Sequence, residues 1–251
     1  MSPSSPFSFT VLCVLGGLVA ASCAPTLEPP PKAQQKPPPP QAMDAGVVWQ
    51  AALDRPDVAA LGWGSPSKAS DEEIAAVFTL TKDDDHAVLH ARHDGRPEPK
   101  PPPAVHFGRA FEEKEHMLAD SCFLRWRWRV TQHPTQNEDA WLDLGASLYV
   151  IFDLPGLLSK GKGFKLGWLQ HPPTKNGDQR GILEVPQRID PAAGRWHDET
   201  ADLCKLYREH FDGDPAEAQV LYVGVVTDAD NTESIAEADY ADIRLQRHPE
   251  P

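Results

Sequence analysis

The residues from Val220 to Leu245 read VLYVGVVTDADNTESIAEADYADIRL. The first seven are apolar and mostly β-branched, which favours a strand buried on both faces. From Tyr240 onward, apolar and polar residues alternate, as in a strand with one buried face. The two faces of this second strand carry, respectively, Ala241, Ile243 and Leu245, and Tyr240, Asp242 and Arg244. Two strands therefore bracket an acidic loop, and we expect the domain to be organised around them.

The loop contains the pattern D-x-D-N-T, which begins at Asp228. Closely spaced oxygen ligands suit Ca²⁺, which binds six to eight of them. One interpretation is a structural calcium site formed by Asp228, Asp230, Asn231 and Asp242. The alternative is an Asx-rich turn whose side chains bond the local backbone. A role in ligand binding or catalysis is the third interpretation.

The composition limits the class of protein. The chain has 251 residues, 40% of them hydrophobic, which is enough for one core. Its net charge of −13 excludes nonspecific binding to nucleic acid, because the phosphates would be repelled.

The N-terminus predicts export. Residues 7–22 are uncharged and largely apolar, too few for a membrane span, and they are followed by Cys23 in an A-A-S-C sequence. This sequence resembles the lipobox of bacterial lipoproteins, so residues 1–22 are the expected signal peptide. Cys23 is then the lipidated residue that anchors the protein to a membrane, in the outer membrane or periplasm. The absence of Lys and Arg from residues 1–10 departs from the usual pattern. An ordinary cleaved signal and an uncleaved anchor are the alternatives.

Proline divides the chain into a tether and a domain. Residues 23–61 are the expected tether, and their PPPKAQQKPPPP run favours an extended polyproline conformation. A short helix is expected in residues 43–61. The folded domain is expected to span residues 62–247.

Two cysteines remain in the predicted domain. Cys122 begins a predicted strand and Cys204 lies in a predicted helix. A disulfide is one interpretation for an exported protein. Two buried free thiols are the interpretation we favour, because cysteine often packs as a small apolar residue. The chain has no CxxC spacing, so zinc is not indicated.

The clearest strand covers residues 122–130. Its apolar face includes Trp126 and Trp128, and its other face carries Arg125, Arg127 and Arg129. The arginine row is interpreted as an outer face that is either solvated or paired with carboxylates across the sheet, or as the lining of a groove for an anionic or sugar ligand.

The remaining pattern predicts a mainly β fold. Further strands are expected at residues 78–81, 87–91, 147–154, 164–169 and 182–185. One helix is expected at residues 198–211, capped by Asp198. Many short strands and one crossover helix favour a jelly-roll-like β-sandwich.

The sequence resembles a family of exported bacterial proteins known as domain of unknown function 3047. The resemblance covers residues 62–247. It rests on LRWRWRV (124–130), LYVIF (148–152), WHDETADLCKLYREHF (196–211), VVTDADNT (225–232) and YADIRL (240–245). It implies a sandwich like those of concanavalin-type lectins and galactose-binding domains, and it implies no activity.

The function expected from these patterns is a non-catalytic binding or structural module for polysaccharide or another envelope component, including an envelope protein. Trp168 beside a predicted loop is a candidate sugar-binding ring, with core packing as the alternative. The histidines at 86, 90 and 93 are interpreted as surface residues. No complete set of catalytic residues is recognised, no cofactor is expected beyond the calcium ion, and the competing hypothesis is a glycan-active enzyme that uses Asp228, Asp230 and Asp242.

Overall fold

The computed structural model describes residues 46–96, 102–154 and 160–249, which all belong to one compact unit, Gln41–Pro251. The strands before the acidic loop are β1 (Val47–Gln50), β2 (Phe78–Asp83), β3 (His86–Asp94), β4 (Phe107–Ala110), β5 (Phe123–Gln132), β6 (Ala146–Asp153), β7 (Lys162–Leu169), β8 (Asp178–Gln179), β9 (Ile182–Ile189), β10 (His197–Asp202) and β11 (Tyr222–Val226). The loop is followed by β12 (Ile235–Gln246). The α-helices are α1 (Asp71–Val77) and α2 (Leu203–His210), and the 3-10 helices are η1 (Ala59–Leu61) and η2 (Leu118–Asp120).

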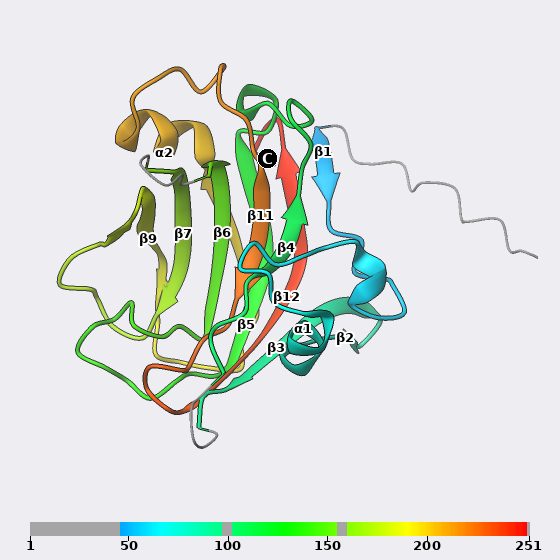
Figure 1. Cartoon of the computed structure of the whole chain (residues 1–251), viewed down its shortest axis with the longest axis vertical. Helices are drawn as coiled ribbons and strands as arrows, with labels where there is room; N and C mark the ends of the chain where they lie inside the picture. Colours follow the sequence, from blue (N-terminus) through cyan, green and yellow to red (C-terminus); the bar gives the residue numbers. More distant parts are fainter. Residues whose placement is uncertain (1–45, 97–101, 155–159, 250–251) are drawn as a thin grey trace, which may run out of the picture. The chain divides into compact units, whose positions relative to one another are not determined.

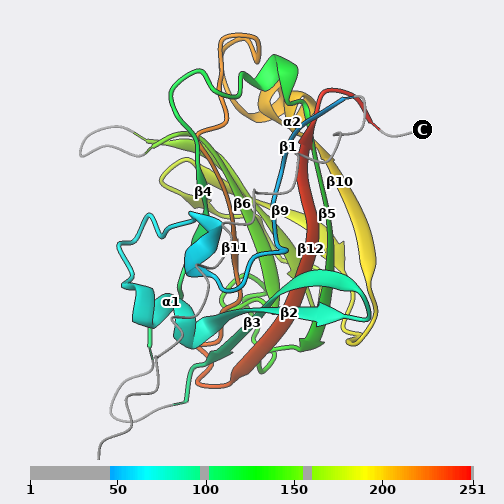
Figure 2. The same cartoon turned by 90° about the vertical axis from the view of Figure 1, so that its right-hand side faces the viewer.

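Two sheets form the predicted sandwich, so the fold class is confirmed. Sheet A has the strand order β10-β5-β12-β3-β2, with β1 also paired to β12. Sheet B has the order β4-β11-β6-β7-β9-β8. Figures 1 and 2 show the two sheets as separate layers, with β11 and β12 in different sheets. The acidic loop between them therefore crosses from one layer to the other.

The two strands that bracket the loop confirm one pattern and correct another. All five residues of β11 are buried, as an unbroken apolar run predicts. In β12, however, Tyr240 lies in the core together with Ile243 and Leu245. A β-bulge between Ala241 and Arg244 adds a residue there and shifts the alternation of faces. The predicted two-face pattern is therefore wrong before the bulge.

The core between the sheets depends on β5. Leu124, Trp126, Trp128 and Val130 are fully buried, as their alternation predicts. The ring of Trp128 lies 5.6 Å from that of Trp168 in β7, so this pair joins the two sheets directly. Aromatic side chains of this size bury roughly 150–250 Å² each and contribute strongly to a core.

Three local predictions are wrong. Residues 197–202, predicted as the start of a helix, form β10, and the helix α2 begins only after its N-cap Asp202. β10 pairs with β5 along six residues, and this pairing outweighs the local helical pattern. The short helix expected in residues 43–61 is replaced by β1 and η1. Because β1 pairs with β12, sheet A includes residues before the predicted domain start at Gly62.

Cys122 and Cys204 form a disulfide, so the interpretation as free thiols is wrong. The pairing of β10 with β5 places Asp202 opposite Phe123, and the backbone N–H of Leu203 donates to the carbonyl of Cys122 at 2.7 Å. The two cysteines therefore lie next to each other at the junction of β10 and α2. A pairing across 82 residues is invisible to local patterns.

The predicted signal peptide, Cys23 and most of the tether lie outside the described residues. Within the part of the chain that the structure describes, no helix is long and apolar enough to cross a membrane.

Candidate functional site

Three loops meet at one end of the sandwich. They are the β5–β6 loop (residues 133–145), the end of β7 with residues 170–171, and the acidic loop between β11 and β12 (residues 227–234). This end lies at the bottom of Figure 1. We call it the rim.

Three carboxylates gather at the rim. Asp143, Asp228 and Asp230 each place one oxygen within 4.8 Å of the other two. Asp143 is 8% exposed and accepts hydrogen bonds from the backbone N–H groups of Asn231 (3.4 Å) and Thr232 (2.7 Å). It also accepts bonds from the side chains of both residues, at 3.0 and 2.6 Å. The β5–β6 loop and the acidic loop are thus joined through one buried carboxylate.

Two buried side chains of sheet A, those of His93 and Tyr240, form hydrogen bonds with the acidic loop and the residues just before it. His93 is fully buried and its Nδ1 accepts a hydrogen bond from the backbone N–H of Ala229 at 3.0 Å. Its surface interpretation was therefore wrong. The hydroxyl of Tyr240 donates to the carbonyl of Val226 and lies 2.9 Å from the hydroxyl of Thr227. Tyr240 and His93 thus fix both sides of the turn that leads to Asp228.

Gly95 gives a test of how tightly this loop is held. A Cβ at Gly95 would collide with the carbonyl oxygen of Ala229 and lie 2.9 Å from the Cα of Asp230. Gly95→Ala must displace backbone, so we expect it to lower the free energy of unfolding by about 1–3 kcal/mol. Urea denaturation measures the loss. Gly64→Ala is the matched control, because a Cβ there meets no atom within 4 Å. Equal stability of the two variants would contradict the close packing of the loop.

An ionisable row lies on the outer face of sheet B, behind the rim. Tyr149, Lys165 and Glu184 are direct neighbours on β6, β7 and β9. Lys165 is 7% exposed, and its ammonium donates to the carbonyl of Trp141 at 3.4 Å. Glu184 accepts hydrogen bonds from the backbone of Gly177 and the side chain of Gln179, each at 2.8 Å. The row therefore contains a buried ammonium, that of Lys165, and a buried carboxylate, that of Glu184.

Electrostatic effects connect this row to the rim. Burial and the neighbouring carboxylates of Asp230 and Asp143 raise the pKa of Asp228 to about 7. Burial lowers the pKa of Lys165, against the opposing effect of Glu184 and Asp228. Burial also raises the pKa of Tyr149, and the charge of Asp228 adds to the rise. These groups therefore share one electrostatic environment.

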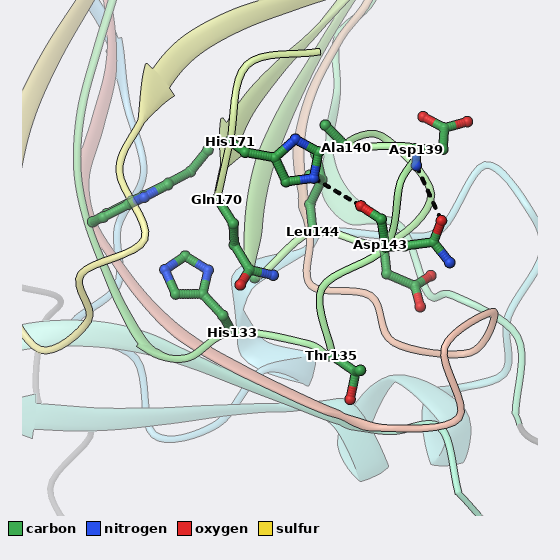
Figure 3. Close-up of a pocket in the computed structure, with 11 residues that line it drawn as sticks. His133, Thr135, Asp139, Ala140, Asp143, Leu144, Gln170 and His171 are labelled. Atoms are coloured by element: carbon green, nitrogen blue, oxygen red, sulfur yellow. Dashed lines mark hydrogen bonds between the residues drawn. The ribbon is translucent and has the colours of Figure 1, made fainter. Parts of the chain in front are cut away.

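A shallow pocket opens at the rim beside Asp143 (Figure 3). Its polar lining includes His133, Thr135, Asp139, Asp143, Gln170 and His171. Its cavity volume is about 10 Å³, enough for one water molecule or one hydroxyl group. The amide nitrogen of Gln170 donates to the carbonyl of Pro134 at 2.9 Å, which leaves its oxygen as an acceptor without a partner among the described residues.

The comparison with known families concerns the last third of the domain. A family model described as "Protein of unknown function (DUF3047)" matches residues 182–244. The resemblance to this family is confirmed over that span. The DUF3047 match runs from β9 into β12 and contains α2, β11 and the acidic loop.

Among solved structures, the chain is similar to the family 30 carbohydrate-binding module of the cellulosomal cellulase Cel9D-Cel44B of Clostridium thermocellum. The identity is 9% and the TM-score 0.36, over 82% of this chain and 95% of that chain. A similarity this distant carries no argument about ligands. No curated protein matches the chain.

The structure separates one residue from the predicted metal set. Asp242 lies in the bulge of β12, and its carboxylate is 3.7 Å from the guanidinium of Arg127 on sheet A. Its place in the three-carboxylate cluster is taken by Asp143. The set Asp228, Asp230 and Asp242, predicted for calcium and for the alternative enzyme, is therefore not assembled.

The predicted ligand-binding residues also lie elsewhere than expected. Trp168 is fully buried and contributes to the floor of the rim pocket, so the prediction of an exposed ring face is wrong. Arg129 bonds Asp239 at 2.7 and 2.9 Å, and Arg127 lies 3.4 Å from Asp198. Both guanidinium groups also lie over the ring of Trp196. Carboxylate pairing across the sheet, the first of the two interpretations, describes these two arginines, and Arg125 also has interaction partners.

Two residues of the site, Tyr149 and Lys165, were missed from the sequence. Tyr149 and Lys165 each stand between two apolar residues of a buried strand, and a polar side chain in such a place is a usable signal for a special environment. The hydrogen bonds that join Asp143 to the acidic loop carry no local signal, because its partners lie 88 and 89 residues away.

Proposed function

We propose that the protein is a non-catalytic binding module of the bacterial cell envelope, exported, anchored through lipid on Cys23, and binding polysaccharide at the rim pocket. Another envelope component, such as a protein, is the alternative partner. Both hypotheses follow from the predicted signal, the tether and a folded domain with a polar pocket.

The observation that carries the proposal is the lining of the rim pocket. Hydroxyl groups of a sugar both donate and accept hydrogen bonds, so their recognition needs donors and acceptors around one space. Imidazole, amide, hydroxyl and carboxylate groups surround this pocket (Figure 3). Its cavity volume of about 10 Å³ matches a single hydroxyl group, so the sugar ring that carries this hydroxyl would lie outside the cavity, against the rim.

The disulfide supports the proposed export. Disulfides persist in oxidising compartments and are rare in the cytosol. The Cys122–Cys204 bond joins two distant parts of the domain, as is usual for a structural disulfide.

Gln170→Leu tests the pocket. The substitution removes the unpaired acceptor with little change in size, and we expect it to weaken retention of a bound neutral polysaccharide by about tenfold. The full chain in mild detergent is assayed on a glycan array and then by titration with the retained glycan. Gln50→Leu, at the exposed end of β1, is the control and is expected to bind like the unchanged chain.

Two results would overturn the proposal. The first is no retention on any glycan at millimolar concentration. The second is release of new reducing ends from the retained polysaccharide, since a binding module leaves its ligand intact.

A further inference from the structure

A second cleft lies between α1, the end of β3 and residues 102–105, which precede β4 (Figure 2). Its cavity volume is about 570 Å³, within the range of about 300–1,000 Å³ in which proteins bind small molecules. It shares no lining residue with the rim pocket. We propose that this cleft binds a carboxylic acid with an apolar body, such as a hydrocarbon chain or ring.

The walls of the cleft are largely apolar. Val77 of α1 and Val105 line it, and both also belong to the hydrophobic core, with only 8% and 5% of their surface exposed. Pro102 and Pro103 line the cleft as well. Proline has no backbone N–H, so these two residues offer ring carbons and no donor. Such walls favour a ligand with a hydrocarbon body, because covering them removes apolar surface from water.

His93 fixes the proline side of the cleft. Its Nδ1 accepts a hydrogen bond from the backbone N–H of Ala229, so its proton is on Nε2, which donates to the carbonyl of Pro102 at 3.1 Å. His93 is fully buried, and both of its ring nitrogens are therefore used. The wall is thus formed before a ligand arrives, which lowers the entropy that binding must overcome.

The charged groups of the lining favour an anion. Asp94 accepts hydrogen bonds from the guanidinium of Arg96 at 2.8 and 2.7 Å. Glu73 accepts two hydrogen bonds from Ser70, at 2.7 and 2.9 Å. Both carboxylates therefore have donors from the protein itself. The ammonium of Lys68, in contrast, forms no hydrogen bond or ion pair with any residue of the described ranges.

Lys68 is held beside the cleft by a turn, in which its backbone N–H donates to the carbonyl of Ser65 at 3.0 Å. The other lining cation, Arg92, lies 3.5 Å from Asp94 and 3.8 Å from Glu237, so its charge is already paired. One ammonium is thus left for the ligand. A carboxylate pairs with it through a charge-assisted hydrogen bond, while the body of the ligand covers the apolar walls.

Octanoate is the probe for this site. Calorimetric titration of the full chain in mild detergent is expected to show one octanoate bound per chain, with a dissociation constant of about 100 μM. Ala76→Phe places a large ring in the cleft from an exposed position of α1 and is expected to abolish this binding. Ala75→Phe is the matched control. Ala75 is the exposed neighbour in the same helix and does not line the cleft, so we expect octanoate to bind as before.

Lys68→Met tests the carboxylate. The substitution removes the charge and keeps the length of the side chain, so octanoate binding is expected to weaken about fivefold while binding of octan-1-ol stays unchanged. Lys114→Met is the control for this variant. Lys114 is also an exposed lysine with positive φ, 64° against 61° for Lys68, but it lies outside the cleft. It is expected to leave the binding of both probes unchanged.

Four outcomes would overturn the proposal: no binding of octanoate at millimolar concentration, unchanged binding in Ala76→Phe, an equal loss in Ala75→Phe, or an equal loss in the two lysine variants. If Ala76→Phe does not fold, the two lysine variants still decide, because both residues are exposed. The result is independent of the polysaccharide proposal, since no glycan enters the assay and no residue of the rim pocket is changed.

Discussion

Replacing Cys122 and Cys204 together by alanine is expected to lower the free energy of unfolding by about 4 kcal/mol. The disulfide closes a loop of 82 residues, and the chain-entropy model gives about 3 kcal/mol for 15 residues and 4.7 kcal/mol for 100. The loss is measured as the shift of the denaturation midpoint of the full chain, with and without the substitutions.

The same bond also fixes α2 against the end of the sandwich. Tyr207 of α2 packs 5.4 Å from Phe152 of sheet B, while Cys204 is linked to the start of β5 in sheet A. The disulfide thus connects a helix that bridges both sheets. We therefore expect the region around α2 to show the earliest loss of protection from hydrogen exchange when the bond is removed.

Reduction of the unchanged chain is the control for side-chain packing. Cys204 is 3% exposed, so alanine removes some packing as well as the cross-link. The reduced chain keeps both sulfur atoms and loses only the bond. If its midpoint equals that of the oxidised chain, the disulfide does not stabilise the domain and the prediction is wrong.

The contrast between strand β5 and helix α2 shows what the sequence could predict. In β5 the burial pattern is local, since alternate residues of one strand meet the same core. The residues HDETAD before α2 contain two aspartates, Asp198 and Asp202, and either could cap the helix. The local pattern does not decide which of them is the N-cap. The choice is made by pairing with β5, which is more than 65 residues away in the chain.

The candidate site was also predicted only in part. The acidic loop itself was found, because a sudden change from apolar to polar residues marks the end of a buried strand. The residues that contact this loop were not predicted. A single inserted residue in β12 turns Asp242 toward Arg127, and the β5–β6 loop brings in Asp143. Bulges and loop-to-loop contacts depend on the assembled sheets, so spacing along the chain does not reveal them.

Trp128→Ala is expected to lower the free energy of unfolding by about 3–5 kcal/mol. Trp128 is fully buried, and its ring lies 5.2 Å from Trp126 and 5.6 Å from Trp168. Alanine would leave a cavity between the sheets that their backbones cannot close. Its indole N–H also donates to the buried carboxylate of Glu199 at 3.4 Å, and that bond would be lost. Chemical denaturation measures the change.

Trp196→Ala is the comparison that separates burial from size. Trp196 is half-buried, lies under the guanidinium groups of Arg127 and Arg129, and donates to Asp83 at 2.6 Å. We expect its loss to cost only about 1 kcal/mol, because such contacts are weak where water reaches them. Equal destabilisation by the two substitutions would contradict the central role of Trp128.

The cavity at Trp128 is also expected to reach the rim. Trp168, which contacts Trp128, contributes to the floor of the rim pocket, and its indole N–H donates to the carbonyl of Asp190 at 2.8 Å. When its neighbour is removed, Trp168 gains room to tilt, and the residues above it lose a rigid base. Ligand retention by Trp128→Ala, measured well below its melting temperature, should therefore fall further than its folded fraction does. Unchanged retention per folded molecule would show that the pocket is held by its loops alone.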